Sequence, residues 1–214
     1  LQDGRIIAVK GVGGYLLLCS AQNEKTINEL RNRKHRPTKP FALLYPSLQN
    51  VENDFKLSSG EKLCLKSRIA PIVLLQPLKS LSNLCTKEIA PNLNLLGVML
   101  PNAPLLQLIA TNFNNPLVAT SANVSGSPIT YTDDDAIHQL SSIADFIVTN
   151  NREILIPQDD SVIKFSALTQ QKIILRRSRG MTPNYFHNRV KNNNIILATG
   201  SLLKSTFTIT HKLN

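Results

Sequence analysis

The sequence predicts an α/β fold, a twisted sheet of mixed parallel and antiparallel strands with flanking helices. Two observations favour it. Short apolar runs of strand length alternate along the chain with segments of helical spacing. Some of the strand-like runs follow one another directly, which adds antiparallel pairs to parallel crossovers. We expect the sheet to present a concave, basic surface.

The first half of the chain opens with two strands, 5–9 and 15–19, around a tight glycine turn, KGVGG. Asn23 is placed to cap a helix over 24–34. Further strands are expected at 41–44, 71–75, 95–100 and 117–119, and further helices near 47–54, 59–66 and 104–110. Residues 77–91 read as a surface loop.

In the second half, three aspartates open a helix over 133–142, where acids suit the helix dipole, so we interpret them as capping and not as a metal site. Strands are expected at 146–149, 162–165 and 173–175. The domain division predicted is 1–185 for a complete domain, 186–194 for a linker, and 195–214 for the start of a following domain. The chain does not begin with Met, and we expect a fragment of a longer protein.

The composition indicates a polyanionic partner. The 24 basic and 14 acidic residues give a net charge of +10, which suits nucleotides or nucleic acid, although only 5% of residues are aromatic. No apolar run approaches the roughly 20 residues of a membrane helix, so no membrane partner is expected. The three cysteines form no CxxC and predict neither a zinc site nor disulfides, which fits a reducing cytoplasm.

A cationic segment, residues 30–44 (LRNRKHRPTKPFALL), is the first candidate site. It carries five lysines and arginines plus His35 between residues 31 and 39, with no acid. Its prolines should end the helix and force extended chain, in which residues two apart share a face. Lys34 and Arg36 are therefore predicted to form an anion clamp. A basic helix end that only complements the helix dipole is the alternative.

A second candidate is PLVATSANVSGSP, residues 116–128. Here a buried strand runs into Thr120, Ser121, Ala122 and Asn123, whose hydroxyls and amide suit an anion or a ligand edge. Such residues also cap ordinary turns. A second cationic cluster, RRSRG, follows the strand at 173–175.

With Lys34-His35-Arg36 and Ser121-Ala122-Asn123 in place, the chain resembles the YrdC-like domain, whose signature is KxR followed by SxN. It is similar to the version found in HypF carbamoyltransferases. That likeness rests on KGVGGY, RKHRPTKPFA, GVMLP, DDSV and RRSRG, in order over residues 1–185. The tail, ILATGSLLKSTF, resembles the opening of HypF's following actin-like ATPase-fold domain.

The resemblance implies that carbamate, derived from carbamoyl phosphate, reacts with ATP to give carbamoyl-adenylate. The carbamoyl group then passes to a cysteine of a HypE-like partner protein in nickel–iron hydrogenase maturation. Mg²⁺ is expected with the phosphates and no metal site on the protein. The resemblance implies catalytic Lys34, Arg36, Ser121 and Asn123, with Thr120, Ser161 and Arg176 added around the nucleotide, and an acyl pocket of Lys10, Gly13 and Tyr15.

Two other functions stay open. Threonylcarbamoyl-adenylate synthases of tRNA modification resemble this fold but carry a PTETVYGL-type segment where this chain has Lys10 to Tyr15. Their GVRxP arginine matches Met99. These departures disfavour an amino-acid substrate, because the carboxylate of a bound amino acid needs a cationic partner and Met99 cannot supply one. A basic double-stranded RNA-binding module is the third interpretation.

Overall fold

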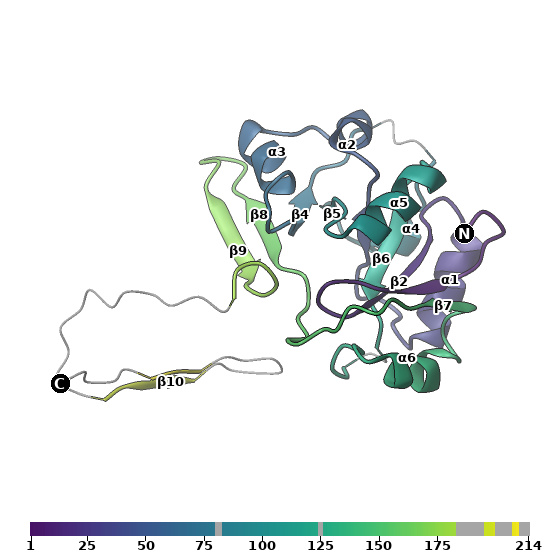
Figure 1. Ribbon diagram of the computed structural model, residues 1–214. Coiled ribbons are helices and arrows are strands. Elements are labelled where there is room, and N and C mark those ends of the chain that lie inside the picture. Colours follow the sequence, from purple (N-terminus) through teal and green to yellow (C-terminus); the bar gives the residue numbers. More distant parts are fainter. Residues whose placement is uncertain (80–82, 124–125, 183–194, 200–206, 210–214) are drawn as a thin grey trace. The chain divides into compact units, whose positions relative to one another are not determined.

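The computed structural model describes residues 1–79, 83–123, 126–182, 195–199 and 207–209. They fall in two compact units, Leu1–Thr182 and Pro183–Asn214, which are described separately. The first unit is built on a nine-stranded sheet with the order β7-β1-β2-β6-β3-β5-β4-β8-β9 (Figure 1). Its strands are β1 Ile7–Lys10, β2 Tyr15–Ser20, β3 Ala42–Leu44, β4 Ile72–Leu75, β5 Leu96–Met99, β6 Leu117–Ser121, β7 Phe146–Val148, β8 Val162–Phe165 and β9 Lys172–Arg176.

The sheet is mixed, as the sequence predicts. The pairs β1–β2, β2–β6, β3–β6, β4–β5 and β8–β9 are antiparallel, whereas β1–β7, β3–β5 and β4–β8 are parallel. β1 and β2 form a hairpin around the glycine turn, which brings Lys10 opposite Tyr15. β6 lies between β2 and β3, so the residues after Ser121 emerge near the middle of the sheet.

The helices cover the two faces unequally. They are α1 Glu24–Arg33, α2 Leu48–Asp54, α3 Ser59–Leu65, α4 Thr86–Ile89, α5 Pro104–Phe113 and α6 Asp133–Leu140. All except α5 contribute buried side chains to the larger core cluster, on one face of the sheet. α5 packs its Leu106 and Ala110 against Leu117 and Ala119 of β6 on the other face (Figure 1).

The helix α4 corrects the prediction of a surface loop over 77–91. Ile89 is fully buried, and its carbonyl accepts a hydrogen bond from Phe41 N at 2.9 Å. The helix has four residues and no side-chain cap, so no periodic pattern or cap residue marks it in the sequence. Contacts with the rest of the fold stabilise this short helix. Residues 80–82 of the predicted loop lie outside the described part.

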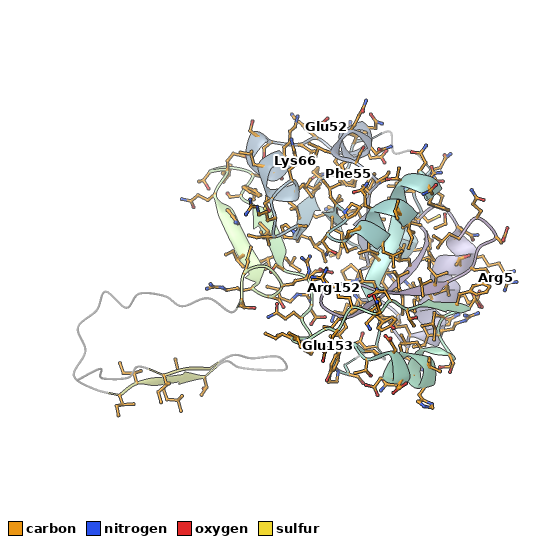
Figure 2. All side chains as sticks on the ribbon, in the orientation of Figure 1. Arg5, Glu52, Phe55, Lys66, Arg152 and Glu153 are labelled. Carbon is orange, nitrogen blue, oxygen red and sulfur yellow. The ribbon has the colours of Figure 1, made fainter. Side chains whose placement is uncertain are left out.

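A long connection, the crossing segment (residues 149–161), leads from β7 at one edge of the sheet to β8 near the other. Its Arg152 and Glu153 are exposed (Figure 2). Near its end it passes the glycine turn so closely that a Cβ on Gly13 would lie 2.3 Å from the carbonyl oxygen of Gln158. Gln158 N donates to Gly13 O at 2.8 Å. Gly13 is therefore required by backbone-to-backbone contact.

The second unit contains an antiparallel strand pair, β10 Leu197–Thr199 and β11 Phe207–Ile209. Both lie within residues 195–214, where the start of a following domain is predicted, while the predicted linker over 186–194 falls outside the described residues. In the described part of the chain, no helix is both long and apolar enough to cross a membrane.

Candidate functional site

The cationic segment leaves α1 through a helix cap and not as extended chain. Lys34 is the C-cap residue with helical dihedral angles (φ −88°, ψ −6°), and His35 follows in the left-handed region at φ +50°. Arg36 N donates to Arg31 O at 3.0 Å, which closes the last turn. The prediction that Lys34 and Arg36 share a face of an extended strand is wrong, because the helix cap reverses the chain between them.

Lys34 instead points into the interior, where it is fully buried. Its ammonium donates to Ser121 O at 2.7 Å, to Asn123 Oδ1 at 2.9 Å and to the Asn123 carbonyl. The KxR and SxN motifs are thus in direct contact. Lysine suits this position because its three donors can serve three oxygens.

The Ser121–Asn123 loop is held on its other side too. Ser121 Oγ donates to Asn123 Oδ1 at 2.9 Å, and Asn123 Nδ2 donates to Ser127 O. Between them, Ala122 N donates to Tyr15 O at 2.8 Å. The loop therefore has a fixed backbone and presents a partly exposed Ser121 at the end of β6.

Arg31 organises the rest of the cationic segment and was not singled out from the sequence. It is 6% exposed, and its guanidinium donates to five carbonyl oxygens. These belong to Arg36, Pro37, Lys39, Glu88 and Ile89. It also lies 4.4 Å over the ring of Phe41. Only the fold brings those carbonyls together, so no local pattern distinguishes Arg31 from its neighbours.

Arg36 and Arg176 form the partly exposed cationic part of the site. Desolvation, together with the charges of Arg31 and Arg176, lowers the pKa of Arg36 to about 10. Arg176 donates through Nε to Asp160 O at 2.7 Å. Its Nη groups make no hydrogen bond or ion pair with any residue that the structure describes. The Arg36 guanidinium donates through Nε to Lys39 O at 3.2 Å and through Nη2 to Pro40 O. Two guanidinium groups from distant segments thus act on each other electrostatically, and Nη1 of Arg36 and both Nη groups of Arg176 have hydrogen-bonding capacity for an anion.

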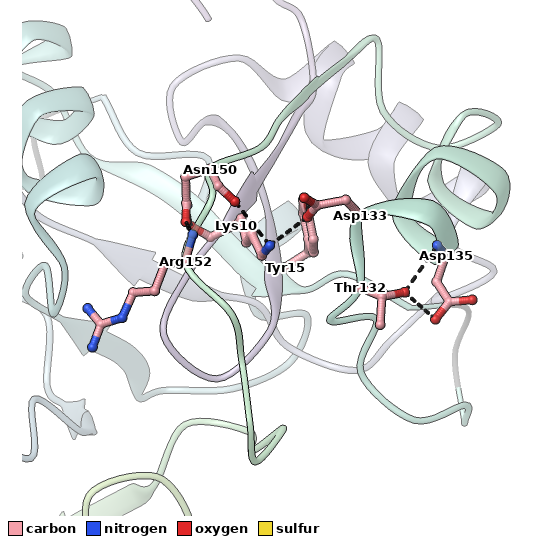
Figure 3. Close-up of polar contacts among 7 residues, drawn as sticks. All are labelled: Lys10, Tyr15, Thr132, Asp133, Asp135, Asn150 and Arg152. Atoms are coloured by element: carbon pink, nitrogen blue, oxygen red, sulfur yellow. Dashed lines mark hydrogen bonds and ion pairs between the residues drawn. The ribbon is translucent and has the colours of Figure 1, made fainter.

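Lys10 and Tyr15 meet at Asp133, the first residue of α6 (Figure 3). Lys10 Nζ lies 2.7 Å from Asp133 Oδ1 and 3.1 Å from Asn150 O, and Tyr15 OH donates to Asp133 at 2.6 Å. The hydrogen bond from Lys10, then that from Tyr15, lowers the pKa of Asp133. Burial, and then the hydrogen bond to Asp133, raises the pKa of Tyr15. The contact joins the glycine-turn hairpin to α6, and apart from the acidic start of the helix no local sequence pattern indicates it.

The remaining predicted residues lie around this centre. Thr120 is buried on the opposite face of β6 from Ser121, since alternate strand residues point to opposite faces. Ser161 is fully buried, and its hydroxyl donates to Arg179 O and accepts from Ser178 N, at 3.0 and 2.9 Å. Among the described residues no three His, Cys, Asp or Glu side chains gather as a metal site. The polar groups that converge here are cations, hydroxyls and amides, which suit phosphate oxygens.

A family model described as "Telomere recombination", which groups the Sua5, YciO and YrdC proteins, matches residues 1–178. The chain belongs to the Sua5/YciO/YrdC family. Carbamoyltransferase HypF of Synechocystis sp. is 38% identical over 209 residues, which cover 98% of this chain and 27% of that protein. Threonylcarbamoyl-AMP synthase of Photobacterium profundum is 29% identical over 149 residues, 65% of this chain and 77% of that protein.

Solved structures agree with the family assignment. Full-length HypF in its phosphate- and nucleotide-bound form matches with a TM-score of 0.90 at 38% identity, over 98% of this chain and 32% of that one. Sua5 of P. abyssi in complex with L-threonine matches with a TM-score of 0.71 at 19% identity, over 83% and 51%, and so shares the fold. The resemblance to the YrdC-like domain of HypF is confirmed. The chain spans about a quarter of the length of the HypF relatives.

Proposed function

We propose that this Sua5/YciO/YrdC domain binds MgATP and forms carbamoyl-adenylate in a HypF-type carbamoyl transfer. The observation that carries the proposal is that the charge of Arg176 acts on Arg36, while the Nη groups of Arg176 bind none of the described residues. Arg36 keeps Nη1 available, because only its Nε and Nη2 donate, to Lys39 O and Pro40 O. Two neighbouring cations repel each other, so an anion placed between them removes an unfavourable interaction as well as gaining two favourable ones. A triphosphate supplies that charge, and the Mg²⁺ arrives bound to it as part of the substrate.

The chemistry suits residues that position and neutralise. A carbamate oxygen is already anionic, so its attack on the α-phosphorus needs no general base. A new bond joins that oxygen to phosphorus, the bond from phosphorus to the bridging oxygen of the β-phosphate breaks, and pyrophosphate leaves with the electron pair. The arginines would stabilise charge on the phosphates, while Ser121 and Asn123 would bind phosphate or acyl oxygens.

The other predicted residues support the site from within the chain. Lys34 fixes the Ser121–Asn123 loop and adds positive charge behind it. Lys10, Gly13 and Tyr15 keep their assignment to the acyl pocket as a prediction, since Tyr15 is joined to that loop through Ala122. Thr120 and Ser161 stay predictions for the nucleotide site, and their burial favours an indirect contribution.

The alternative substrate is threonine with bicarbonate, favoured by the likeness to a threonylcarbamoyl-AMP synthase. Met99 argues against it, because this residue matches the arginine of those enzymes and is buried among apolar side chains. Carbamate has no amino-acid carboxylate that would need a cation there. A HypE-like protein with an acceptor cysteine remains the proposed partner.

Isotope exchange between pyrophosphate and ATP tests the reaction. The chain is mixed with MgATP, labelled pyrophosphate and either ammonium carbamate or threonine plus bicarbonate. We expect label in ATP with carbamate, no acceleration by threonine, and no exchange without either acyl donor. Exchange that requires threonine would replace the proposal by the tRNA-modification function. Double-stranded RNA binding that MgATP does not displace would favour the RNA-binding module.

A further inference from the structure

Arg176 and Arg179, two of the three arginines of the second cationic cluster, differ in burial, since Arg176 is partly exposed. Arg179 is 9% exposed. Its Nε and Nη2 lie 2.8 and 2.7 Å from Asp160 Oδ1, and Nη1 and Nη2 donate to Ile69 O and Ala70 O at 3.0 and 2.9 Å. A guanidinium engaged on these sides has little capacity left for a ligand, so Arg179 is part of the framework.

Asp160 links this buried arginine to the partly exposed Arg176. Its carboxylate binds Arg179, and its backbone carbonyl accepts the Nε hydrogen of Arg176 at 2.7 Å. This Nε contact ties the Arg176 guanidinium to the Asp160 carbonyl and restricts its orientation, while both Nη groups stay available. The position of the Asp160 carbonyl therefore limits where the Nη groups of Arg176 can lie.

Hydrogen bonds join the two backbone segments that carry Asp160 and Arg179. Arg179 N donates to Asp159 O at 3.0 Å, and the Ser161 hydroxyl bridges Ser178 N and Arg179 O. The next residue, Gly180, has φ +80°, and a Cβ there would lie 3.0 Å from Ile69 Cα. Glycine at this position lets the backbone turn directly after Arg179, so the Arg179 side chain stays in contact with Asp160.

The crossing segment brings Asp160 to this place. The hydrogen bond from Gln158 to Gly13 holds the crossing segment at a point two residues before Asp160. A Cβ on Gly13 would lie 3.4 Å from Cδ of Arg179. Arg179 thus packs beside the glycine turn while it holds the carboxylate. Arg176 is partly exposed and feels the like charge of Arg36, so its side chain would otherwise turn away from Arg36. An orienting contact is needed to hold it there.

We propose that Asp160 and Arg179 are positioning residues, an ion pair that holds Arg176 in the orientation that binds the phosphates. This rests on the proposed function, because it takes Arg176 as a phosphate ligand. The pair touches no substrate. Its contribution passes through the Asp160 carbonyl to Arg176.

A double-mutant cycle on the 214-residue chain tests this, with MgATP affinity measured by calorimetry and stability by urea unfolding. The variants are Asp160→Asn, Arg176→Ala and the double substitution. Asp160→Asn keeps the backbone carbonyl and loses the ion pair. We expect each single variant to weaken MgATP binding by about tenfold, and the double variant to bind no more weakly than Arg176→Ala.

Two further variants separate positioning from general stability. Asp145→Asn removes the carboxylate that Arg33 binds at 3.1 Å, away from Arg176, and should lower stability with MgATP affinity unchanged. Asp160→Glu keeps a carboxylate for Arg179 and should restore most of the affinity. If Asp160→Asn proves too unstable to purify, Arg179→Lys enters the same cycle, since an ammonium cannot reproduce the arginine's contacts.

Losses that add in the double variant, or unchanged affinity in Asp160→Asn while Arg176→Ala binds weakly, would overturn the positioning role and leave the proposed function standing. If Asp145→Asn weakened MgATP binding as much as Asp160→Asn, the effect would be general and the positioning role would also be wrong. Unchanged affinity in Arg176→Ala would instead remove Arg176 from the nucleotide site. That result would overturn this inference together with its premise.

Discussion

At the scale of single residues, Lys34 shows how one side chain serves both the fold and the proposed site. Its ammonium lies against oxygens of Ser121 and Asn123. The resemblance to KxR and SxN proteins placed these residues in one site, and the structure brings them into contact. Arg31, Asp133 and Asp160 could not be found in this way, because their partners are distant backbone carbonyls and side chains that only the completed fold brings near.

Replacing Lys34 by Met is expected to destabilise the domain. The side chain keeps its length but loses the donors, so buried oxygens of the Ser121–Asn123 loop lose a hydrogen bond that a charged group supplied. The expected loss is about 1–3 kcal/mol of unfolding free energy, measured by urea denaturation. Lys25→Met, at an exposed position of α1, is the matched control. Equal stability of the two variants would contradict the role of Lys34 in the loop.

Asp133 predicts a pH dependence. Its pKa is lowered in the folded state by Lys10 and Tyr15, so its contribution to stability is full above the unfolded pKa of about 4 and is lost as the pH falls through the folded value. The unfolding free energy of the wild type should therefore fall more steeply below about pH 4 than that of Asp133→Asn. Urea titrations at a series of pH values measure how the unfolding free energy of each protein changes with pH. Identical slopes would show that the contacts of Asp133 with Lys10 and Tyr15 do not contribute to stability.

At the scale of elements, local pattern located nearly every strand and helix of the first unit. Asn23 does cap α1, with its side chain accepting from Thr26 N, and Pro104 opens α5. Prediction failed where tertiary contacts outweigh local preference. The prolines suggested extended chain after α1. Instead, Arg31 donates hydrogen bonds to the carbonyl oxygens of residues 36, 37 and 39, and these bonds hold the segment as a compact cap. The helix α4 was missed for the same reason.

The glycine turn gives a prediction about an element. A methyl group on Gly13 would overlap Gln158 O, so Gly13→Ala must push the crossing segment away. We expect a loss of roughly 1–3 kcal/mol, the usual cost of overpacking, and faster proteolysis within residues 149–161. Val12→Ala, at the exposed neighbouring position, is the control and should match the wild type. Slow cleavage in Gly13→Ala would show that the turn and the segment are not coupled.

At the scale of the whole molecule, the chain divides at Thr182, and the second unit contains the strand pair β10–β11. A lone two-stranded sheet is marginally stable. We therefore expect a chain of residues 1–182 to melt within about 2–4 °C of the 214-residue chain, the shift that 1 kcal/mol produces. Scanning calorimetry of both chains measures it. A large drop for the shorter chain would assign the tail to the core of the first unit.

The central claim is that Arg36 and Arg176 make a triphosphate site, and titration of Arg36→Ala with MgATP and with adenosine tests it most directly. We expect MgATP binding to weaken by roughly 1.5–3 kcal/mol, the scale of charge-assisted hydrogen bonds. Adenosine binding should change little, and Lys25→Ala should bind both as the wild type does. MgATP affinity in Arg36→Ala equal to that of the wild type, with the fold intact, would contradict the account.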